Sequence, residues 1–335
     1  MIQDLNTNYS SDEINGYIDK FADTNVLVIG DIILDEFLWG DVSRISPEAP
    51  VPVVEVNQET KMLGGAANVV NNIYSLGGHV SLCGVIGDDN TGLELLRTMQ
   101  EMNLNTDGII TEPQRCTSIK SRIVANNQQV VRFDRETQKD LQPETIEKLI
   151  DFIKTKKEKL NAIVVEDYGK GVISAPLMKA LRDVVLDSNI FIAVDPKEDN
   201  FEYYQDVDIL TPNQHEAGAF CKVKIVDEKT LIEVGNKMIE KLNCQSVLIT
   251  QGKDGMTLFE KGKDPCHIPT KAKKVFDVSG AGDTVISTLC LGMSAALDLK
   301  TSAFISNFAA GIVCGEVGTS VVKAEDLKYS ILSGH

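Results

Sequence analysis

The chain has 335 residues, a length that fits one or two globular domains. It carries 33 Lys and Arg against 49 Asp and Glu, for a formal net charge of −16, and 43% of its residues are hydrophobic. This composition excludes a disordered or fibrous chain, and the acidic balance argues against nucleic acid or an anionic membrane as a partner, because both attract positive protein surfaces. An anionic ligand would bind only where cations, a metal or backbone amides reverse the local field.

The first 24 residues are acidic and lack an apolar run, so we expect an N-terminal extension rather than a signal peptide. No stretch reaches the ~18 apolar residues of a membrane span. The 7 cysteines lie far apart without a Cys-x-x-Cys pair, which is typical of buried residues in a reducing compartment rather than of zinc ligands or disulfides. We therefore expect a cytoplasmic protein.

Short, almost continuously hydrophobic segments alternate with amphipathic segments along the chain. The predicted strands are Val26–Ile29, Ala162–Val165, Ile190–Val194, Val207–Leu210 and Ser246–Thr250. The clearest predicted helices are Pro143–Lys157, Ala175–Leu186 and Glu228–Leu242. Strands that are hydrophobic on both faces and alternate with helices predict an α/β fold, with a doubly wound, mostly parallel sheet flanked by helices.

Two segments interrupt this alternation. Val42–Val56 contains three prolines, and Ser118–Val124 with Gln129–Phe133 has the pattern of a β-hairpin. We expect a small β-rich lid, made of residues of about 40–60 and 116–135, on a single domain that spans residues 25–335. Such a lid would cover a site or pair two chains.

Polar residues follow five of the predicted strands, at the point where each strand is expected to end. These segments are Gly30-Asp31, Glu166-Asp167, Asp195-Pro196-Lys197, Thr211-Pro212-Asn213 and Thr250-Gln251-Gly252. Ligands of open α/β sheets bind beyond the carboxyl ends of the strands. Asp, Asn and Gly also begin turns and cap helices, but five such ends together predict a site on this rim.

The motif Asp277-Val-Ser-Gly-Ala-Gly-Asp283-Thr precedes a predicted helix at Val285–Ala296. The small residues at 280–282 permit a tight turn whose N–H groups form an anion site at the helix N-terminus. Asp283 at the same place can accept a proton from a hydroxyl. Phosphoryl transfer to an alcohol needs this pair, although a plain glycine-rich turn capped by Asp283 would have the same sequence.

A second glycine motif, Leu63-Gly-Gly-Ala-Ala-Asn68, opens a predicted helix at Ala66–Leu76, and Gly77 and Gly87 follow it. With both motifs in this order, the sequence resembles the ribokinase-like (PfkB) family of carbohydrate kinases. It departs from the two family patterns at Val70 and Thr288, which are helix-packing positions. The resemblance implies ATP and Mg²⁺ as cofactors and, in many members, a monovalent cation such as K⁺.

The resemblance also implies roles for individual residues. Asp283 would be the catalytic base, with Gly280, Ala281 and Gly282 as the anion hole. The sugar side would comprise Asp31, Asp35, Gly64, Gly65, Asn68 and Asp167. The nucleotide side would comprise Asn213, Glu216, Thr250, Gly252, Lys253, Gly255, Asn307 and Gly311. Glu216 belongs to an Asn-x-x-Glu motif that places Mg²⁺ indirectly, and Asp277 and Ser279 would line the monovalent-cation site.

Residues 30–53, Asn126–Arg132 and Glu166–Gly171 are similar to one group within this family, the kinases of D-glycero-β-D-manno-heptose 7-phosphate. That group makes the 1,7-bisphosphate by ATP-dependent phosphorylation of the anomeric hydroxyl, for ADP-heptose and lipopolysaccharide core synthesis. A substrate that already carries a phosphate needs cations away from the reacting hydroxyl. The candidates are Arg44, Lys120, Arg122, Arg132 and Lys170.

Several alternatives stay open. The chain could be a PfkB-family kinase of another sugar, sugar phosphate or nucleoside, or a non-catalytic sugar or nucleotide sensor on the same fold. A P-loop kinase and a dinucleotide dehydrogenase are disfavoured because their glycine motifs are missing. By analogy we expect a homodimer formed through the lid. We also expect the kinase to fill the chain, without the nucleotidyltransferase domain that some heptose kinases carry behind it.

Overall fold

The computed structural model describes residues 2–5, 9–126, 128–270, 278–316 and 320–333. The strands of its main sheet are β1 (Gln3–Asp4), β2 (Asn25–Ile45), β4 (His79–Gly87), β5 (Gly108–Glu112), β8 (Ala162–Glu166), β9 (Phe191–Asp195), β10 (Ile209–Leu210), β11 (Ser246–Thr250), β12 (Met256–Glu260) and β13 (Cys266–Ile268). Their order is β1-β13-β12-β11-β10-β9-β8-β2-β4-β5. Only the β11–β12 and β12–β13 pairs are antiparallel, which confirms the predicted mostly parallel α/β sheet.

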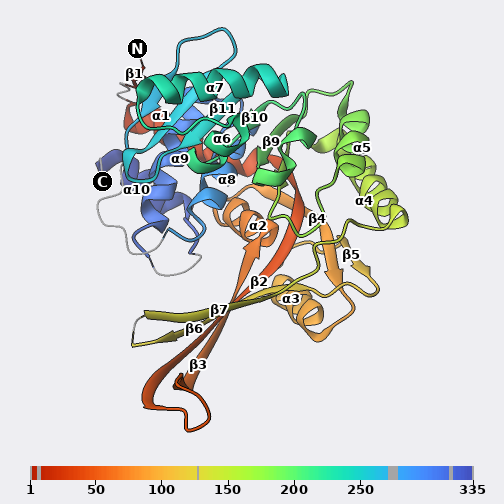
Figure 1. Cartoon of the computed structure of the whole chain (residues 1–335). Helices are drawn as coiled ribbons and strands as arrows, with labels where there is room; N and C mark the ends of the chain where they lie inside the picture. Colours follow the sequence, from red (N-terminus) through yellow and green to blue (C-terminus); the bar gives the residue numbers. More distant parts are fainter. Residues whose placement is uncertain (1, 6–8, 127, 271–277, 317–319, 334–335) are drawn as a thin grey trace.

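Helices cover both faces of this sheet (Figure 1). One face packs on α1 (Ser11–Asp19), α2 (Ala66–Ser75), α3 (Asn90–Glu101), α8 (Ala281–Ser294), α9 (Leu299–Val313) and α10 (Ala324–Ser333). The other packs on α4 (Pro143–Lys156), α5 (Ala175–Val185), α6 (Gln214–Cys221) and α7 (Glu228–Leu242). Short 3₁₀ helices lie at Lys20–Asp23, Lys157–Lys159, Glu198–Tyr203 and Gly252–Asp254.

The two-sided packing explains the continuous hydrophobic strands. Successive side chains of a strand point to opposite faces, so Val26 and Val28 enter one hydrophobic cluster while Leu27 and Ile29 enter the other. Both faces are covered, and a polar residue at any of these positions would be buried.

The described part of the predicted N-terminal extension packs against the rest of the fold. β1 adds to the edge of the main sheet beside β13, and Ile14, Ile18 and Phe21 are buried in the core. None of the helices in the described residues is long and apolar enough to cross a membrane.

The prediction that the first strand ends at Gly30-Asp31 was wrong, because β2 continues for 21 residues in all. It pairs with β4 as far as Asp31 and then leaves the main sheet. From Ile32 onward it pairs with β3 (Pro52–Gly65), and from Ile33 with β6 (Ser118–Ala125). A change of pairing partners therefore takes the place of a strand end, and one strand serves two sheets.

The second sheet projects from the body of the molecule as a lid of four strands (Figure 1). The predicted hairpin is confirmed, because β6 pairs antiparallel with β7 (Gln128–Arg135). The proline-rich segment forms the bends between β2 and β3, and Pro52 is the first residue of β3, a strand position that does not require an N–H donor. The lid strands begin closer to the main sheet than residue 40, because β2 enters the lid at Ile32.

Candidate active site

Asp283 lies in the first turn of α8 and is only 3% exposed. Its Oδ2 accepts a hydrogen bond of 2.6 Å from the side-chain amide of Asn68, and its Oδ1 accepts one of 3.0 Å from the Tyr168 hydroxyl. Burial raises the pKa of Asp283, and the two hydrogen bonds oppose that rise by stabilising the anion. The carboxylate is therefore buried, fixed in orientation and still has lone pairs with which to accept a proton.

The glycine-rich turn before Asp283 has the geometry of an anion site. Gly280 has a φ of +77°, a left-handed conformation that favours glycine. The N–H of Ala281 donates to the carbonyl of Val278, whereas those of Gly280, Gly282 and Asp283 have no acceptor among the described residues. Two of the three residues predicted for the anion hole, Gly280 and Gly282, therefore keep an N–H group for an anion. Ser279 lies in this turn, and Asp277 falls outside the described residues.

Two further carboxylates stand beside the base. Glu166 ends β8 and Asp195 ends β9, and their oxygens and those of Asp283 lie within 4.8 Å of one another. Asp195 accepts a hydrogen bond of 3.0 Å from the Thr211 hydroxyl. Glu166 is fully buried, and neither of its oxygens has a hydrogen-bond partner in the part of the chain that the structure describes.

This arrangement is electrostatically unfavourable for three anions. Burial, followed by repulsion from neighbouring carboxylates, raises the pKa of Glu166 and Asp195 well above their usual values. The group is therefore stabilised either by a shared proton or by a bound cation. The strand-end pattern pointed to both residues, but nothing in the sequence assigned them a role.

The predicted sugar-side residues gather next to Asp283. Asn68 contacts the base directly, and Asp35 accepts a hydrogen bond of 2.5 Å from Arg122. Gly64 lies against Asp35, because a Cβ atom at position 64 would stand 2.2 Å from the Asp35 Oδ2 atom. Gly65, with a φ of +56°, leads from β3 into α2 and so places Asn68 at the base.

Asp31 and Asp167, which we also assigned to the sugar, accept hydrogen bonds from protein groups. Asp31 accepts hydrogen bonds of 2.8, 3.0 and 3.2 Å from the backbone amides of Tyr168, Lys170 and Val172. Burial, with added repulsion from Asp167, raises the pKa of Asp31 to about 6. Asp167 accepts hydrogen bonds from the backbone amide of Gly169 and from the side chains of Asn200 and Tyr204. Both carboxylates therefore organise the loop after β8.

Three of the five predicted cations converge above this loop. Arg122 forms the ion pair with Asp35, and Lys170 forms one of 2.7 Å with Glu136. The Lys120 ammonium lies 4.2 Å from the centroid of the Tyr168 ring, and no carboxylate of the described residues lies within ion-pair distance of it.

Burial lowers the pKa of Lys120 more than any other influence. The charge of Asp35 opposes this effect, and the nearby Lys170 and Arg122 add to it. An anion bound at Lys120 would relieve the repulsion among these cations.

The other two predicted cations lie farther out on the lid. The Arg132 side chain is 52% exposed and forms an ion pair of 3.1 Å with Asp134. Arg44 is exposed near the end of β2, where it pairs in register with Val53 of β3. The structure does not bring Arg44 to the site.

On the nucleotide side, Asn213 and Glu216 cap α6. The Asn213 side chain accepts from the Glu216 amide, and the Glu216 carboxylate accepts from the Asn213 amide at 2.9 Å. The Asn-x-x-Glu motif is therefore a capping box. After burial, the negative charge of Glu216 is the next influence that raises the pKa of Asp195.

The remaining predicted nucleotide residues lie at the end of β11, in the turn after it and on α9. Thr250 ends β11, beside Asn213, and Gly252, Lys253 and Gly255 form the turn into β12. Asn307 on α9 donates a hydrogen bond of 2.8 Å to the carbonyl of Pro269, and Gly311 lies one turn later on the same helix.

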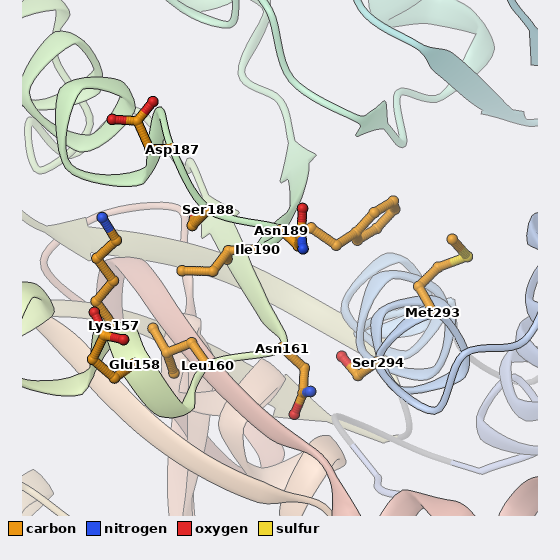
Figure 2. Close-up of a pocket in the computed structure, with 11 residues that line it drawn as sticks. Lys157, Glu158, Leu160, Asn161, Asp187, Ser188, Asn189, Ile190, Met293 and Ser294 are labelled. Carbon is orange, nitrogen blue, oxygen red and sulfur yellow. The ribbon is translucent and has the colours of Figure 1, made fainter.

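A cavity of about 570 Å³ lies at the opposite ends of β8 and β9 (Figure 2). Its lining includes Asn161 just before β8, Ile190 just before β9 and Ser294 at the end of α8. Asp283 begins α8, and Glu166 and Asp195 end their strands, so this cavity is separate from the carboxylate group.

Solved structures share the fold. Phosphofructokinase-2 from Escherichia coli, in complex with substrates and products, superposes with a TM-score of 0.76 at 16% identity and covers 92% of this chain and 99% of that one. Ribokinase from Arabidopsis thaliana, complexed with ribose and ATP, superposes with a TM-score of 0.71 at 16% identity and covers 91% and 97%.

Curated proteins found by sequence are more similar to this chain in sequence than these solved structures are. The bifunctional protein HldE of Desulfatibacillum aliphaticivorans is 42% identical over 314 residues, which are 94% of this chain and 64% of that protein. HldE of Citrifermentans bemidjiense is 42% identical over 323 residues, with 96% and 66% covered. The chain thus spans just under two thirds of the length of these relatives. The model of the pfkB family carbohydrate kinases matches residues 23–326, and the chain therefore belongs to this family of carbohydrate kinases.

Proposed function

We propose that this chain is an ATP-dependent kinase that phosphorylates the anomeric hydroxyl of D-glycero-β-D-manno-heptose 7-phosphate, a step towards ADP-heptose and the lipopolysaccharide core. The family supports a sugar as acceptor. The observation that carries the finer proposal is Lys120, a half-buried cation above the base that has no carboxylate partner among the described residues. It suits a phosphate on the end of the sugar that does not react.

In this reaction Asp283 accepts the proton of the anomeric hydroxyl while the hydroxyl oxygen attacks the γ-phosphorus of ATP in line, and the bond from the γ-phosphorus to the bridging oxygen breaks to release ADP. Asn68 and Tyr168 keep the carboxylate oriented during the transfer. The amides of Gly282 and Asp283 stabilise the negative charge on the transferred phosphoryl group. Lys120, with its neighbours Arg122 and Lys170, holds the remote phosphate and so fixes the sugar relative to the base.

The residues present fit Mg²⁺, because it prefers oxygen ligands and Glu166 offers two buried carboxylate oxygens without partners among the described residues. The ion would be held by Glu166 and Asp195, and indirectly by Glu216. The ion would supply positive charge next to the phosphates of the nucleotide. We also propose a K⁺ site at Asp277 and Ser279. If the kinase is equally active when K⁺ is replaced by N-methylglucamine, a cation too large for such a site, this proposal is wrong.

Glu166→Gln should stabilise the metal-free protein at pH 8 by about 2 °C or more in Tm. The folded state holds the Glu166 proton more tightly than the unfolded state does, so the free energy of unfolding falls as pH rises above the ordinary glutamate pKa. A neutral amide removes that loss. The same change should weaken nucleotide-free Mn²⁺ binding, followed by electron paramagnetic resonance, by about tenfold or more.

Asp208→Asn is the matched control, because burial also raises the pKa of Asp208 while its carboxylate is held by the Ile192 amide. It should leave Mn²⁺ affinity unchanged. Equal affinity of the wild type and the Glu166→Gln protein for Mn²⁺ would rule out Glu166 as a ligand.

A substrate panel tests the function itself. We expect kcat/KM for the heptose 7-phosphate to exceed that for fructose 1-phosphate, fructose 6-phosphate, ribose and adenosine. A bound remote phosphate accounts for about 10–100-fold over an unphosphorylated sugar. Preference for another acceptor would make the chain a kinase of that compound. Binding of ATP and sugar phosphate without ADP release would make it a sensor.

We further propose that the lid joins two copies of the chain. The lid face opposite the cations carries Val131 and Phe133, which are 46% and 49% exposed, and they pair in register with Ile123 and Ser121. An apolar patch of this kind is typical of an interface. Sedimentation equilibrium at micromolar concentration should give a dimer, and a monomer would overturn this proposal.

A further inference from the structure

Tyr168 touches both the base and the lid. Its hydroxyl donates to the Asp283 Oδ1 atom at 3.0 Å, and its ring lies under the ammonium of Lys120 on β6 at 4.2 Å. Its backbone amide donates to Asp31, which places the residue at the start of the loop after β8. Neither glycine motif of the sequence includes it.

The loop that carries Tyr168 is fastened to the root of the lid at two more points. Lys170 forms its ion pair with Glu136, the residue that follows β7. Arg115, just before β6, donates to the carbonyl of Lys170 at 2.9 Å and to that of Thr137 at 3.2 Å. The Arg115 guanidinium is buried and paired with Glu112 at 2.7 Å, so this connection is fixed to the main sheet.

These contacts make a continuous path from the lid to the base. Lys120 on the lid contacts the Tyr168 ring, and the Tyr168 hydroxyl contacts the carboxylate of Asp283. A displacement of β6 would remove the cation from the ring while the backbone of the loop stays anchored to Asp31. The link between β6 and the base therefore passes through the side chain of Tyr168.

We propose that Tyr168 is a positioning residue that couples the lid to the base: with Lys120 over its ring, its hydroxyl holds Asp283 in the orientation that proton transfer needs. The proposal rests on the proposed role of Asp283. It ties full activity of the base to a lid in place, and so limits transfer of the phosphoryl group to water when no sugar is bound.

The chemistry of the hydroxyl fixes the direction of the effect. A phenol has one hydrogen to donate, and Tyr168 donates it to the Asp283 Oδ1 atom, while the Asn68 amide donates to Oδ2. The carboxylate is thus held at both oxygens. Without the Tyr168 hydroxyl it is held at one oxygen only, and it presents its lone pairs to the attacking hydroxyl less often in the correct orientation.

Tyr168→Phe keeps the ring under Lys120 and removes only the hydroxyl. We expect kcat to fall by about tenfold, with KM for the sugar phosphate and for ATP unchanged, because the lost hydrogen bond orients the base and contacts neither substrate. Tyr204→Phe is the matched control, because Tyr204 is a buried tyrosine whose hydroxyl donates to Asp167 rather than to the base. It should lower Tm and leave kcat nearly unchanged.

A double-mutant cycle on kcat tests the link to the lid. At saturating substrate, kcat no longer depends on the contribution of Lys120 to substrate binding. Lys120→Gln and Tyr168→Leu should each lower kcat, and the double variant should be no slower than the slower single variant. Lys120→Arg, which keeps a cation over the ring, should restore most of the loss.

An unchanged kcat in Tyr168→Phe, or additive effects in the cycle, would overturn the coupling. This failure is separable from failure of the proposed function. If Asp283→Asn keeps its turnover, the assignment of the base is wrong. If it loses turnover while Tyr168→Phe turns over like the wild type, only the role of Tyr168 is wrong.

Discussion

Asp283→Asn is expected to lower kcat by about 10²–10⁴-fold while ATP binding stays nearly unchanged. The amide can still accept a hydrogen bond from Asn68 or Tyr168, so the local structure should persist. It cannot take a proton from the attacking hydroxyl. Steady-state rates and nucleotide titrations on the same preparations would separate the two effects.

Asp298→Asn is the matched control for this substitution. Asp298 is the N-cap of α9, the helix that follows α8, and asparagine caps helices as well as aspartate does. We expect wild-type turnover from it. An Asp283→Asn protein within tenfold of wild-type kcat would show that proton removal by this residue is not needed for transfer.

Lys120→Gln is expected to raise KM for the sugar phosphate by about 10–100-fold, because hydrogen bonds to charged groups contribute about 1.5–3 kcal/mol. The fall in kcat, which passes through Tyr168, should be smaller. An unphosphorylated sugar should show little change in KM, since it makes no contact that needs the ammonium. Initial rates with both kinds of acceptor provide the comparison.

Arg132→Gln provides a control on the same lid, because it removes a cation that is exposed and already paired with Asp134. It should change KM little. Equal effects of Lys120→Gln and Arg132→Gln would mean that the lid attracts the substrate through its total charge rather than through one bound phosphate.

The sequence predicted the architecture because the strands are hydrophobic on both faces, and it predicted the meeting of two distant motifs. Asn68 and Asp283 stand 215 positions apart, yet each follows a glycine turn that opens a helix at the same rim. Local patterns of this kind survive in a single sequence, since turn and capping chemistry depends on neighbouring residues.

The roles of Tyr168 and Glu166 could not be predicted in this way. Their importance comes from contacts with residues on other elements, which no local pattern encodes. The cations show the same limit. Register alone puts Lys120 opposite Asp35 and Arg122 opposite Phe37 on one face of the lid, whereas Arg44 lies at the far end of β2.

The strand end expected at Gly30-Asp31 failed for a related reason. Glycine and aspartate usually mark a turn, but the following Ile32, Ile33 and Leu34 continue the hydrophobic pattern and are buried where β2 enters the lid. Asp31 then caps the loop after β8 instead of a helix. The aspartate at position 31 thus makes a tertiary contact with the loop after β8, and the local sequence does not reveal this contact.

Because β2 runs without a break from the main sheet into the lid, no flexible hinge loop separates the two sheets along this strand. Its base is clamped between β4 and β8, and its outer half carries β3 and β6 through backbone hydrogen bonds. A small change of twist where the strand leaves the main sheet would displace the outer end much more than the base. Movement of the lid against the main sheet would therefore deform β2 itself, and the stiffness of this strand would limit how far the outer end travels.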